Sequence, residues 1–532
     1  MAALALLPQL LLFRAYVNDD AYITFRYSAN LAAGVGPYFN PGEHVEGYTN
    51  PLLMLLAALW IALGGGDSVH LFAKALGALS AVGLVLVAAW AAWRWHPDRD
   101  DMFVPAAAAF IAAAFLSFTP NVAVNAMSGL ETLPTALLVL LGIAALALTA
   151  ESRRWRGAGV LWGLAVWCRP EVPLVFAVAW CAAAAWALAA AGDWRRFPRA
   201  LLADGFTAFG AFLLLVGLRY ALYDGELVPN TYHAKSGGFG RVESVSYLAE
   251  SLARPFLGWL PLVAGFGLAA FAAKRAPALA VLGVAGLAGA ALPIWTGADW
   301  MMGGRMSVPY LAPLAVALAC GWSWALCRAA RPTGLRLAGL TLLVVALFAV
   351  PARQRLLTAQ NVAVRAKGYE TGHGAVAAFV GGNAKPGETV AVMDIGIIGY
   401  RNPRLRILDV SGLTDREIAK SPGAFLQKLY DPAYVLDQRP RYIVHALYRR
   451  PGAPYRAPES LDGFRGWTPM EERLLAHPDH LSGYRKRDWE GEPPPRDWVE
   501  QLARQLGAVA AFEHGHPGIS FVLVVFERQD AG

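Results

Sequence analysis

The sequence predicts a polytopic α-helical membrane protein with about eleven spans and a C-terminal extracytoplasmic α/β domain. Three observations support this fold class. The chain of 532 residues is 56% hydrophobic and only 16% charged, whereas charged residues make up about a quarter of ordinary soluble proteins. Its Ala-, Leu-, Val- and Trp-rich runs can cross a hydrocarbon core of about 30 Å. Beyond residue 351 the charged residues, Pro and Gly increase, and the apolar runs shorten to strand length.

We expect spans, each accurate to within a few residues, at 2–17, 71–93, 103–118, 131–150, 157–169, 172–191, 201–220, 252–272, 277–295, 308–328 and 336–351. The short loops on one side hold most of the basic residues: Arg94, Arg99, Arg153, Arg154, Arg156, Arg195, Arg196, Arg199, Lys274, Arg275, Arg328, Arg331 and Arg336. The longer loops on the other side hold Arg26, Lys74, Arg169, Arg219, Lys235, Arg241, Arg254 and Arg305. By the positive-inside rule the first set is cytoplasmic, which places the C-terminal domain outside.

The run "NPLLMLLAALWIALGG" at 50–65 is not expected to be a full crossing. It is short, begins with Asn-Pro like a capped helix, and ends in glycines. We interpret it as a helix at the outer interface within a first external segment, 18–70; the alternative is that it crosses the membrane. The first run, 2–17, is thin, contains Arg14 and precedes no small-residue cleavage site, which argues against a signal peptide. A truncated start of the sequence would explain its shortness.

We divide the chain into a transmembrane module, 1–351, and an extracytoplasmic domain, 352–532. In the second part four short runs rich in β-branched residues predict strands. These are 388–394, 405–410, 441–447 and 519–527, with helical segments between them, for example around 413–430. This alternation predicts a small α/β layer domain.

The cysteines and the net charge argue against several function classes. Cys168, Cys181, Cys320 and Cys327 lie in or beside apolar runs and form no CxxC pair, so we expect buried thiols rather than a zinc site or a disulfide framework. The net charge of +7 is spread over loops, and membrane topology explains it better than nucleic-acid binding.

Two adjacent carboxylates, Asp19 and Asp20, follow the first apolar run directly. Asn18 or Asp19 can cap the helix "DAYITFRYSANLAAG", which Gly34 would end, and acidic residues suit a helix N-terminus. An uncharged Ser or Thr would cap at a lower desolvation cost near a membrane exit. The position of the pair therefore favours a functional role over capping alone.

The stretch "DDAYITFRYSANLAAGVGPYFNPGEHVEGYTNPL" (19–52) resembles the first external loop of the GT-C glycosyltransferases. It is most similar to the mycobacterial terminal β-1,2-arabinofuranosyltransferase family, in which an acidic pair precedes FRYAxNLAxGxGxxFNPGExVEGYTNPL. Four later stretches also fit: "MSGLET" (127–132), "RPE" (169–171), "GADWMMGGRMSVP" (297–309) and "DIGIIGY…ILDVSGLTD" (394–415). The resemblance covers most of the chain, and the thin first span is its main departure.

The resemblance implies inverting transfer of a sugar from a polyprenyl-phosphate donor to an envelope glycan or lipid on the outer face of a bacterial inner membrane. Such a transfer needs a base for the acceptor hydroxyl and cations for the departing phosphate. Asp19 matches the Asp of the Asp-Glu pair in lipid-A-modifying and protein-mannosylating members, so we expect it to be the base. Asp20 would orient the acceptor. No cofactor is expected to be required, and a divalent cation at Asp20 stays open, as does the sugar, with arabinofuranose implied by the family.

Three predicted outer ends carry candidate donor-binding residues, each with a structural alternative. Arg169 binds phosphate or snorkels and pairs with Glu171. Lys235, with Tyr232 and His233 in "PNTYHAKSGG", lies in a phosphate-binding or simply flexible loop. Arg305 pairs naturally with Asp299, either at the substrate or in an interfacial loop.

For the remaining polar candidates, a structural role is the preferred interpretation. Ser128 and Glu131 match a capping box, which leaves sugar contact by Glu131 open. Glu43, His44 and Glu46 are expected in turns, which leaves acceptor or metal contact open. Asp394 and Asp409 are expected in turns or caps after strands, which leaves a position facing the active site open. No metal site is predicted from them.

Two other function classes remain as alternatives. A transporter or flippase of lipid-linked precursors also needs membrane-embedded charges, but transporters usually show matched halves, and no internal repeat is present here. A structural or sensor protein would leave the Asp19–Asp20 pair without a role. The hypothesis that the protein is an enzyme is therefore preferred.

Overall fold

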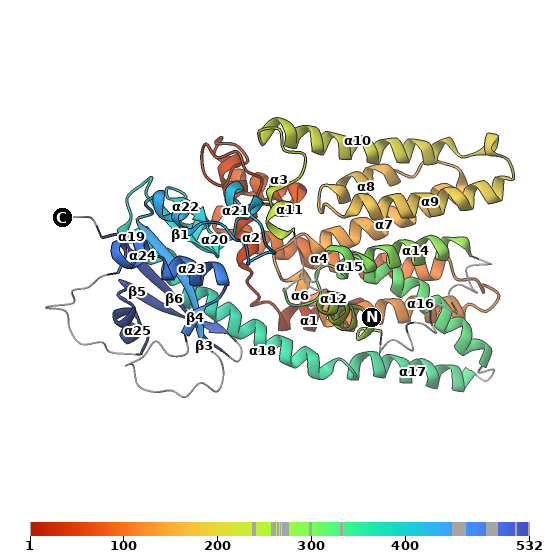
Figure 1. The fold of residues 1–532 in the computed structure, drawn as a ribbon. Helices are drawn as coiled ribbons and strands as arrows, with labels where there is room; N and C mark the ends of the chain where they lie inside the picture. The colour runs from red at the N-terminus through yellow and green to blue at the C-terminus, as the bar shows by residue number, and fades with distance from the viewer. Residues whose placement is uncertain are drawn as a thin grey trace.

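The computed structural model describes residues 2–236, 241–256, 262, 265, 268, 276–296, 301–329, 333–449, 464–485, 498–516 and 519–529. Long helices form an elongated bundle, and a sheet flanked by shorter helices lies at one end of it (Figure 1). The long helix pair α17 and α18 runs from the far end of the bundle to the sheet.

Most of the predicted spans are helices with nearly the predicted bounds. The bundle contains α1 (Leu6–Leu12), α4 (Val69–Arg94), α5 (Phe103–Phe118), α6 (Pro120–Ala126), α7 (Thr132–Ser152), α8 (Ala158–Val166), α9 (Val172–Ala191), α10 (Arg199–Leu222), α12 (Arg241–Leu248), α14 (Pro277–Ala291), α15 (Pro293–Thr296), α16 (Val308–Ala329) and α17 (Thr333–Ala349). Within the described ranges six helices can span a membrane by length and composition, or seven if α5 and α6, bent by 59°, form one span. The protein is therefore a multi-pass membrane protein. Much of the span expected at 252–272 lies outside the described residues.

Two N-terminal segments are shorter than full crossings. A 3₁₀ turn (Ala2–Ala5) and α1 end at Leu12, so the helix is shorter than the run predicted at 2–17. The run at 50–65 forms α3 (Pro51–Trp60) and a π-helical turn (Ile61–Gly65). Gly64 interrupts this turn with a φ of +94°, a conformation that glycine adopts easily. A short 3₁₀ turn (Gly66–Ser68) then leads into α4, so α3 is a separate helix of ten residues.

Among the described loops of the basic set, those that join α4 to α5, α7 to α8 and α9 to α10 lie at the end of the bundle away from the sheet (Figure 1). Arg94 at the end of α4 pairs with Glu151 at the end of α7, at 2.8 Å. Arg336 at the start of α17 pairs with Asp101, which precedes α5, at 2.5 Å. These contacts hold loops of the basic set together on one side of the bundle.

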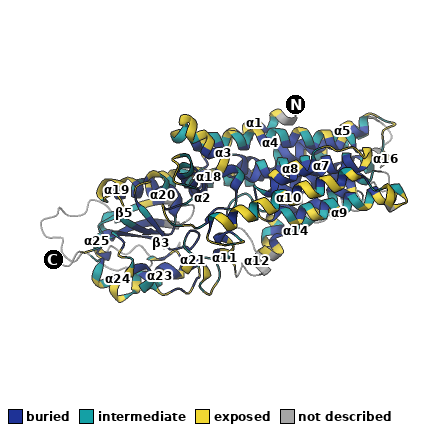
Figure 2. Ribbon diagram, turned by 90° about the horizontal axis from the view of Figure 1, so that it is seen from above, coloured by how far each residue is buried: buried dark blue, intermediate teal, exposed yellow. Residues whose placement is uncertain are grey.

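The outer surface of the bundle suits a lipid environment. Figure 2 shows buried residues along the middle of the bundle and exposed residues along the outer faces of α9 and α10. On α10 the exposed side chains include Phe206 (73% exposed), Phe209, Leu213 and Leu214. Exposed apolar stripes of this length would be unfavourable in water and favourable in a bilayer.

The C-terminal sheet has the order β2-β1-β3-β6-β5, with β4 paired to β3. Its strands are β1 (Thr389–Val392), β2 (Arg406–Asp409), β3 (Tyr442–Arg449), β4 (Phe464–Gly466), β5 (Ala510–His516) and β6 (Ile519–Glu527). β1 runs parallel to β2 and β3, whereas β6 runs antiparallel to β3 and β5. The four predicted strands are confirmed; β4 and β5 were missed, because β4 has three residues and "AAFEHGH" lacks β-branched residues.

Short helices surround this sheet and connect it to the bundle. They are α18 (Ala352–Gly368), α19 (Ala375–Asn383), α20 (Ile395–Arg401), α21 (Arg416–Lys420), α22 (Pro432–Asp437), α23 (Pro469–Ala476), α24 (Pro478–Gly483) and α25 (Trp498–Leu506). A π-helical turn (Tyr369–Gly374) joins α18 to α19. The helix expected around 413–430 is confined to the five residues of α21, followed by turns and irregular chain.

Candidate active site at the junction of the bundle and the sheet domain

Helix α2 (Asp19–Ala32), which carries the acidic pair, forms the junction between the two parts of the chain. The side chain of Asn18 accepts a hydrogen bond from the backbone N–H of Asp20 at 3.0 Å and caps the helix. Gly34, with a φ of +79°, follows its C-terminus, as predicted. α2 packs along α20 of the sheet domain, so both aspartates lie at the boundary between the two parts.

Asp19 is buried, at 4% exposure, against the first turn of α20. Its Oδ2 accepts a hydrogen bond from the backbone N–H of Gly396 at 2.8 Å, and its Oδ1 accepts one from Ile397 at 2.7 Å. Asp394 occupies the N-cap position of α20, but its carboxylate contacts Nε2 of His373 at 2.9 Å instead. Burial raises the pKa of Asp19, and His373 and the two amide donors oppose that rise. Asp19 thus caps a helix from a distant part of the chain.

Arg26, two turns further along α2, binds the opposite end of α20. Its guanidinium donates to the backbone oxygens of Gly399 (2.5 Å), Asn402 (3.4 Å) and Leu405 (2.8 Å), and also to Phe39 O and Asn40 Oδ1. The side chain is almost fully buried, and burial lowers its pKa to about 10, so it stays charged at neutral pH. A carboxylate at the N-terminus and a cation at the C-terminus both complement the helix dipole. We call Asp19 and Arg26 the α20 clamp.

Replacing Gly396 by Ala should break the contact between Asp19 and α20. A Cβ at this position would lie 1.9 Å from the Asp19 carbonyl oxygen, and backbone on both sides leaves little room to adjust. Overpacking of this kind costs about 1–3 kcal/mol or more, measurable as a lower midpoint of denaturant unfolding. Gly382→Ala in α19 is the matched control, because a Cβ there meets nothing within 4 Å. Equal midpoints for the two variants would contradict the close packing at Gly396.

Asp20 lines a cavity on the other side of the junction. This cavity, of about 50 Å³, brings Asp20 together with Glu131, Lys235 and Arg305. Its remaining walls are Ile23, Thr24, Gly47, Tyr48, Thr49, Asn50, Leu130, Thr231 and Leu413. They come from α2, the chain before α3, the start of α7, α11 (Asn230–Lys235) and the sheet domain. A space this size holds one or two water molecules, so a sugar requires the walls to move apart.

Glu131 is held in place by partners from three segments. Asn50 Nδ2 donates to its Oε2 at 2.8 Å, and Asn50 Oδ1 in turn accepts from Thr24 at 3.1 Å. Arg169 lies 3.3 Å from the other Glu131 oxygen and 2.5 Å from Glu171. The guanidinium of Arg169 is buried between these two glutamates and does not line the cavity. Arg169 is therefore placed to position Glu131, and the pairing with Glu171 that the sequence suggested is present.

The capping box expected at Ser128 and Glu131 is wrong. Glu131 occupies the N-cap position of α7 without a side-chain capping bond. The backbone N–H of Ser128 donates to Asn125 O. The carboxylate of Glu131 is instead drawn to Asn50 and Arg169, because a buried charge is stabilised most by charged and amide donors.

The other donor-site candidates are only partly brought together. Lys235 lies in the wall of the Asp20 cavity, with its Nζ also 5.4 Å from the ring centre of Phe425. Tyr232 is 63% exposed and does not line this cavity. His233 faces a second cavity beside α11. Asp299 lies outside the described residues.

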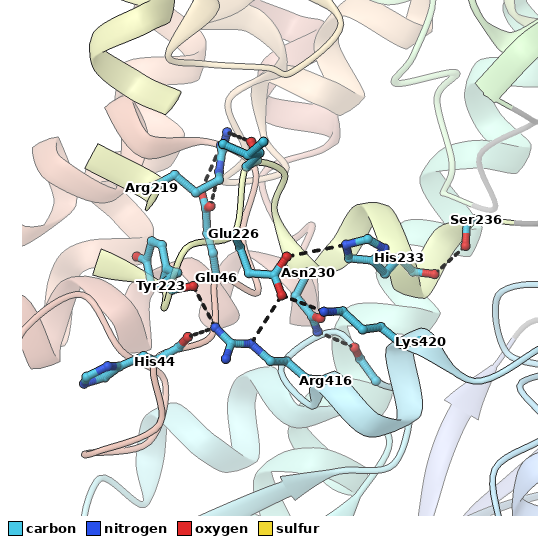
Figure 3. A network of polar contacts seen from close by, with 12 residues as sticks. His44, Glu46, Arg219, Tyr223, Glu226, Asn230, His233, Ser236, Arg416 and Lys420 are labelled. Atoms are coloured by element: carbon cyan, nitrogen blue, oxygen red, sulfur yellow. Dashed lines mark hydrogen bonds and ion pairs between the residues drawn. The ribbon is translucent and has the colours of Figure 1, made fainter. Parts of the chain in front are cut away.

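The acidic residues of the first external segment hold elements together. Glu43 pairs with Arg406 of β2 at 2.6 Å. Glu46 is buried against Arg219 at the end of α10, as Figure 3 shows. His44 Nδ1 lies 3.0 Å from Asp224.

In the sheet domain, Asp409 accepts hydrogen bonds from Ser411 and Thr414, as a turn residue does. In the described part of the chain, no group of three or more His, Cys, Asp or Glu side chains is arranged to hold a metal ion. The expected burial of the thiols holds for Cys168 and Cys320, whereas Cys181 is exposed.

Sequence reasoning missed Arg26, Asn50 and Asn230. The side-chain amide of Asn230 donates to the backbone oxygens of Gly412 (2.9 Å) and Leu413 (3.0 Å) of the sheet domain. Asn50 and Asn230 each stand beside a proline at a helix start, a position that by itself suggests only a cap. Their partners are far away in the sequence, so no local signal marked them.

Comparisons with known proteins agree with this architecture. The family model of a domain of unknown function, DUF8728, matches residues 360–500. The terminal β-(1→2)-arabinofuranosyltransferase of Mycobacterium tuberculosis is 31% identical over 280 residues, 50% of this chain and 42% of that protein. The match thus spans less than half the length of the curated relative.

Two solved structures share the fold. ArnT from Cupriavidus metallidurans, bound to undecaprenyl phosphate, matches with a TM-score of 0.52 at 16% identity, over 77% of this chain and 86% of ArnT. The Archaeoglobus fulgidus oligosaccharyltransferase, tethered to an acceptor peptide, matches with a TM-score of 0.50 at 12% identity, over 99% of this chain and 88% of that one. This chain is therefore a multi-pass membrane protein with the fold of the GT-C glycosyltransferases, similar in sequence over half its length to a terminal arabinofuranosyltransferase.

Proposed function

We propose that the protein is an inverting glycosyltransferase that moves a sugar from a polyprenyl-phosphate donor to an envelope glycan or lipid. One observation carries the proposal: the junction cavity combines two carboxylates, Asp20 and Glu131, with two cations, Lys235 and Arg305. A carboxylate is the group needed to accept a proton from an attacking hydroxyl. Cations are the groups needed to stabilise a departing phosphate.

The proposed reaction is a single displacement. Asp20 accepts the proton of the acceptor hydroxyl while the hydroxyl oxygen forms a bond to the anomeric carbon. The bond between that carbon and the phosphate oxygen breaks on the opposite face, and the electron pair leaves with the polyprenyl phosphate. Lys235 and Arg305 hold the phosphate, and the configuration at the anomeric carbon inverts.

Asp20 is a better candidate for the base than Asp19, which the family resemblance had suggested. Both carboxylate oxygens of Asp19 already accept backbone hydrogen bonds from α20. A proton acceptor must reach the substrate hydroxyl, and only Asp20 of the pair lines the cavity. Glu131, held by Asn50 and Arg169, would orient the sugar.

The proposed orientation puts the reaction on the outer face of the bacterial inner membrane. The Arg-rich loops lie at the end of the bundle away from the sheet, and such loops normally face the cytoplasm. The cavity and the sheet domain would then be extracytoplasmic. The undecaprenyl phosphate bound to ArnT supports a polyprenyl donor, and the mycobacterial relative supports arabinofuranose as the sugar.

Transfer should persist after chelation of divalent cations, because Lys235 and Arg305 provide positive charge for the phosphate. The assay uses the full chain in lipid nanodiscs, polyprenyl-phosphate arabinofuranose and an arabinan oligosaccharide, with products measured by mass spectrometry. We expect the same rate with and without EDTA. Activity that is lost in EDTA and restored by Mg²⁺ would contradict the metal-free mechanism. Absence of a covalent product, together with donor flux across vesicles, would replace the enzyme with a flippase.

A further inference from the structure

A second cavity lies beside the first, between α11 and the chain that follows α21. It has a volume of about 520 Å³. Its walls are His233 and Ser236 on one side and Ala419, Lys420, Ser421, Pro422, Gly423, Ala424 and Lys428 on the other. Figure 3 shows His233 and Lys420 pointing to Glu226, with Ser236 beside the backbone oxygen of His233. None of the described wall residues belongs to the long bundle helices.

The two cavities share the short helix α11. Thr231 and Lys235 line the Asp20 cavity, whereas His233 lines the second one. Lys235 also approaches Phe425, in the chain segment that forms the far wall of the second cavity. A molecule bound in the second cavity therefore lies one short helix away from Asp20.

Lys428 gives the second cavity its chemical character. The residue is 2% exposed, and its ammonium donates to the backbone oxygen of His233 at 2.9 Å. An ammonium has three N–H donors, and among the described residues the His233 oxygen is the one hydrogen-bond acceptor of Lys428. No described carboxylate lies within ion-pair distance of the Lys428 ammonium. A buried cation without a counter-ion is costly, so the site favours an anionic ligand.

The other cavity residues agree with this preference. Among the residues that the structure describes, no Asp or Glu lines the cavity. Lys420, at its edge, pairs with Glu226 at 2.6 Å, and Glu226 also lies 3.8 Å from His233. Ser236 and Ser421 add hydroxyl groups, which can donate to oxyanions.

We propose that this cavity binds an oxyanion, a phosphate or carboxylate group, carried by the sugar acceptor. The assignment to the acceptor rests on the proposed transferase function. The polyprenyl chain of a donor must lie in the bilayer, whereas this cavity is formed by α11 and the sheet domain. An acidic group held at Lys428 would present a neighbouring hydroxyl of the same molecule toward α11 and Asp20.

The first experiment measures binding of inorganic phosphate to the full chain in phosphatidylcholine nanodiscs by equilibrium dialysis. We expect saturable binding that weakens at least tenfold in Lys428→Met and several-fold in Lys420→Met. Lys367→Met, an exposed lysine on α18 outside both cavities, is the matched control and should bind like the wild type. Lys428→Met should fold, because an apolar side chain of similar length removes the cost of burying an unpaired charge. The exposed Lys420→Met gives a second readout. Phosphate binding that is equal in all four proteins would overturn the proposal.

The second experiment separates the acceptor from other sources of the anion. With a phosphorylated oligosaccharide acceptor, Lys428→Met should raise KM at least tenfold with little change in kcat, and a neutral acceptor should show no such effect. Competition for phosphate by phosphatidylglycerol in the nanodisc would overturn the acceptor assignment in favour of a lipid headgroup. If the wild type binds phosphate through Lys428 but transfers no sugar, the anion site stands and the transferase function fails.

Discussion

Replacing Asp20 by Asn should lower the rate of sugar transfer by about 10²–10⁴-fold, the usual contribution of a general base. The Asn side chain keeps the size of Asp but cannot accept the proton of the acceptor hydroxyl. Asp20 is half-buried at the cavity wall, and the cap on α2 depends on its backbone N–H rather than its side chain. We therefore expect the unfolding midpoint of the variant to stay close to that of the wild type. Initial rates at saturating donor, with folding checked by thermal unfolding, measure the effect.

Asp19→Asn is the matched control, and we expect it to lose stability rather than catalytic rate. An Asn at this position can accept a hydrogen bond through one oxygen only, so its amide would face one of the N–H groups of Gly396 and Ile397. An unsatisfied buried donor costs about 1–3 kcal/mol. The protein should lose stability, while the folded fraction keeps most of its kcat. If Asp19→Asn is stable but inactive and Asp20→Asn is active, then Asp19 is the general base and the assignment to Asp20 is wrong.

The contrast between the two aspartates shows what the sequence could predict. Hydrophobic length identified the spans, and β-branched runs identified β1, β2, β3 and β6, because these signals are local. The helix after Asn18 and its end at Gly34 were also predicted from local capping rules. Which carboxylate faces which partner depends on α20, which lies 377 positions beyond Asp19. No pattern within the first fifty residues contains that information.

Charged residues were harder to assign than helices for the same physical reason. Glu131 follows a serine at capping-box spacing, yet its carboxylate is held by Asn50 and Arg169 from other segments. Arg26 looks like an ordinary cation on an amphipathic helix, yet it is among the largest fully buried side chains. The orientation of such charged side chains depends on ion pairs and amide contacts between distant segments. A local sequence pattern contains only one of the two partners.

Replacing Arg26 by Met should detach the sheet domain from the bundle, because each buried acceptor left without its donor costs about 1–3 kcal/mol. The substitution leaves the backbone oxygens of Gly399, Asn402 and Leu405 without their donor in a buried place. The bundle itself has no part in these bonds and should stay folded. Hydrogen exchange should therefore rise in α20 and the neighbouring strands of the sheet domain but not in the bundle helices.

Arg401→Met is the matched control, because Arg401 ends the same helix but is 43% exposed in a 3.4 Å pair with Glu370. Exposed pairs of this kind contribute at most about 1 kcal/mol, so exchange in α20 should stay near the wild-type level.

Since Asp19 and Arg26 hold the two ends of one helix, the double variant Asp19→Asn/Arg26→Met should lose less stability than the sum of the single variants. Additive losses would mean that the two ends of α20 are held independently. An Arg26→Met protein as stable as Arg401→Met would contradict the α20 clamp itself. The loss of transfer in Arg26→Met should follow the loss of docking, because Leu413 of the sheet domain closes one wall of the Asp20 cavity.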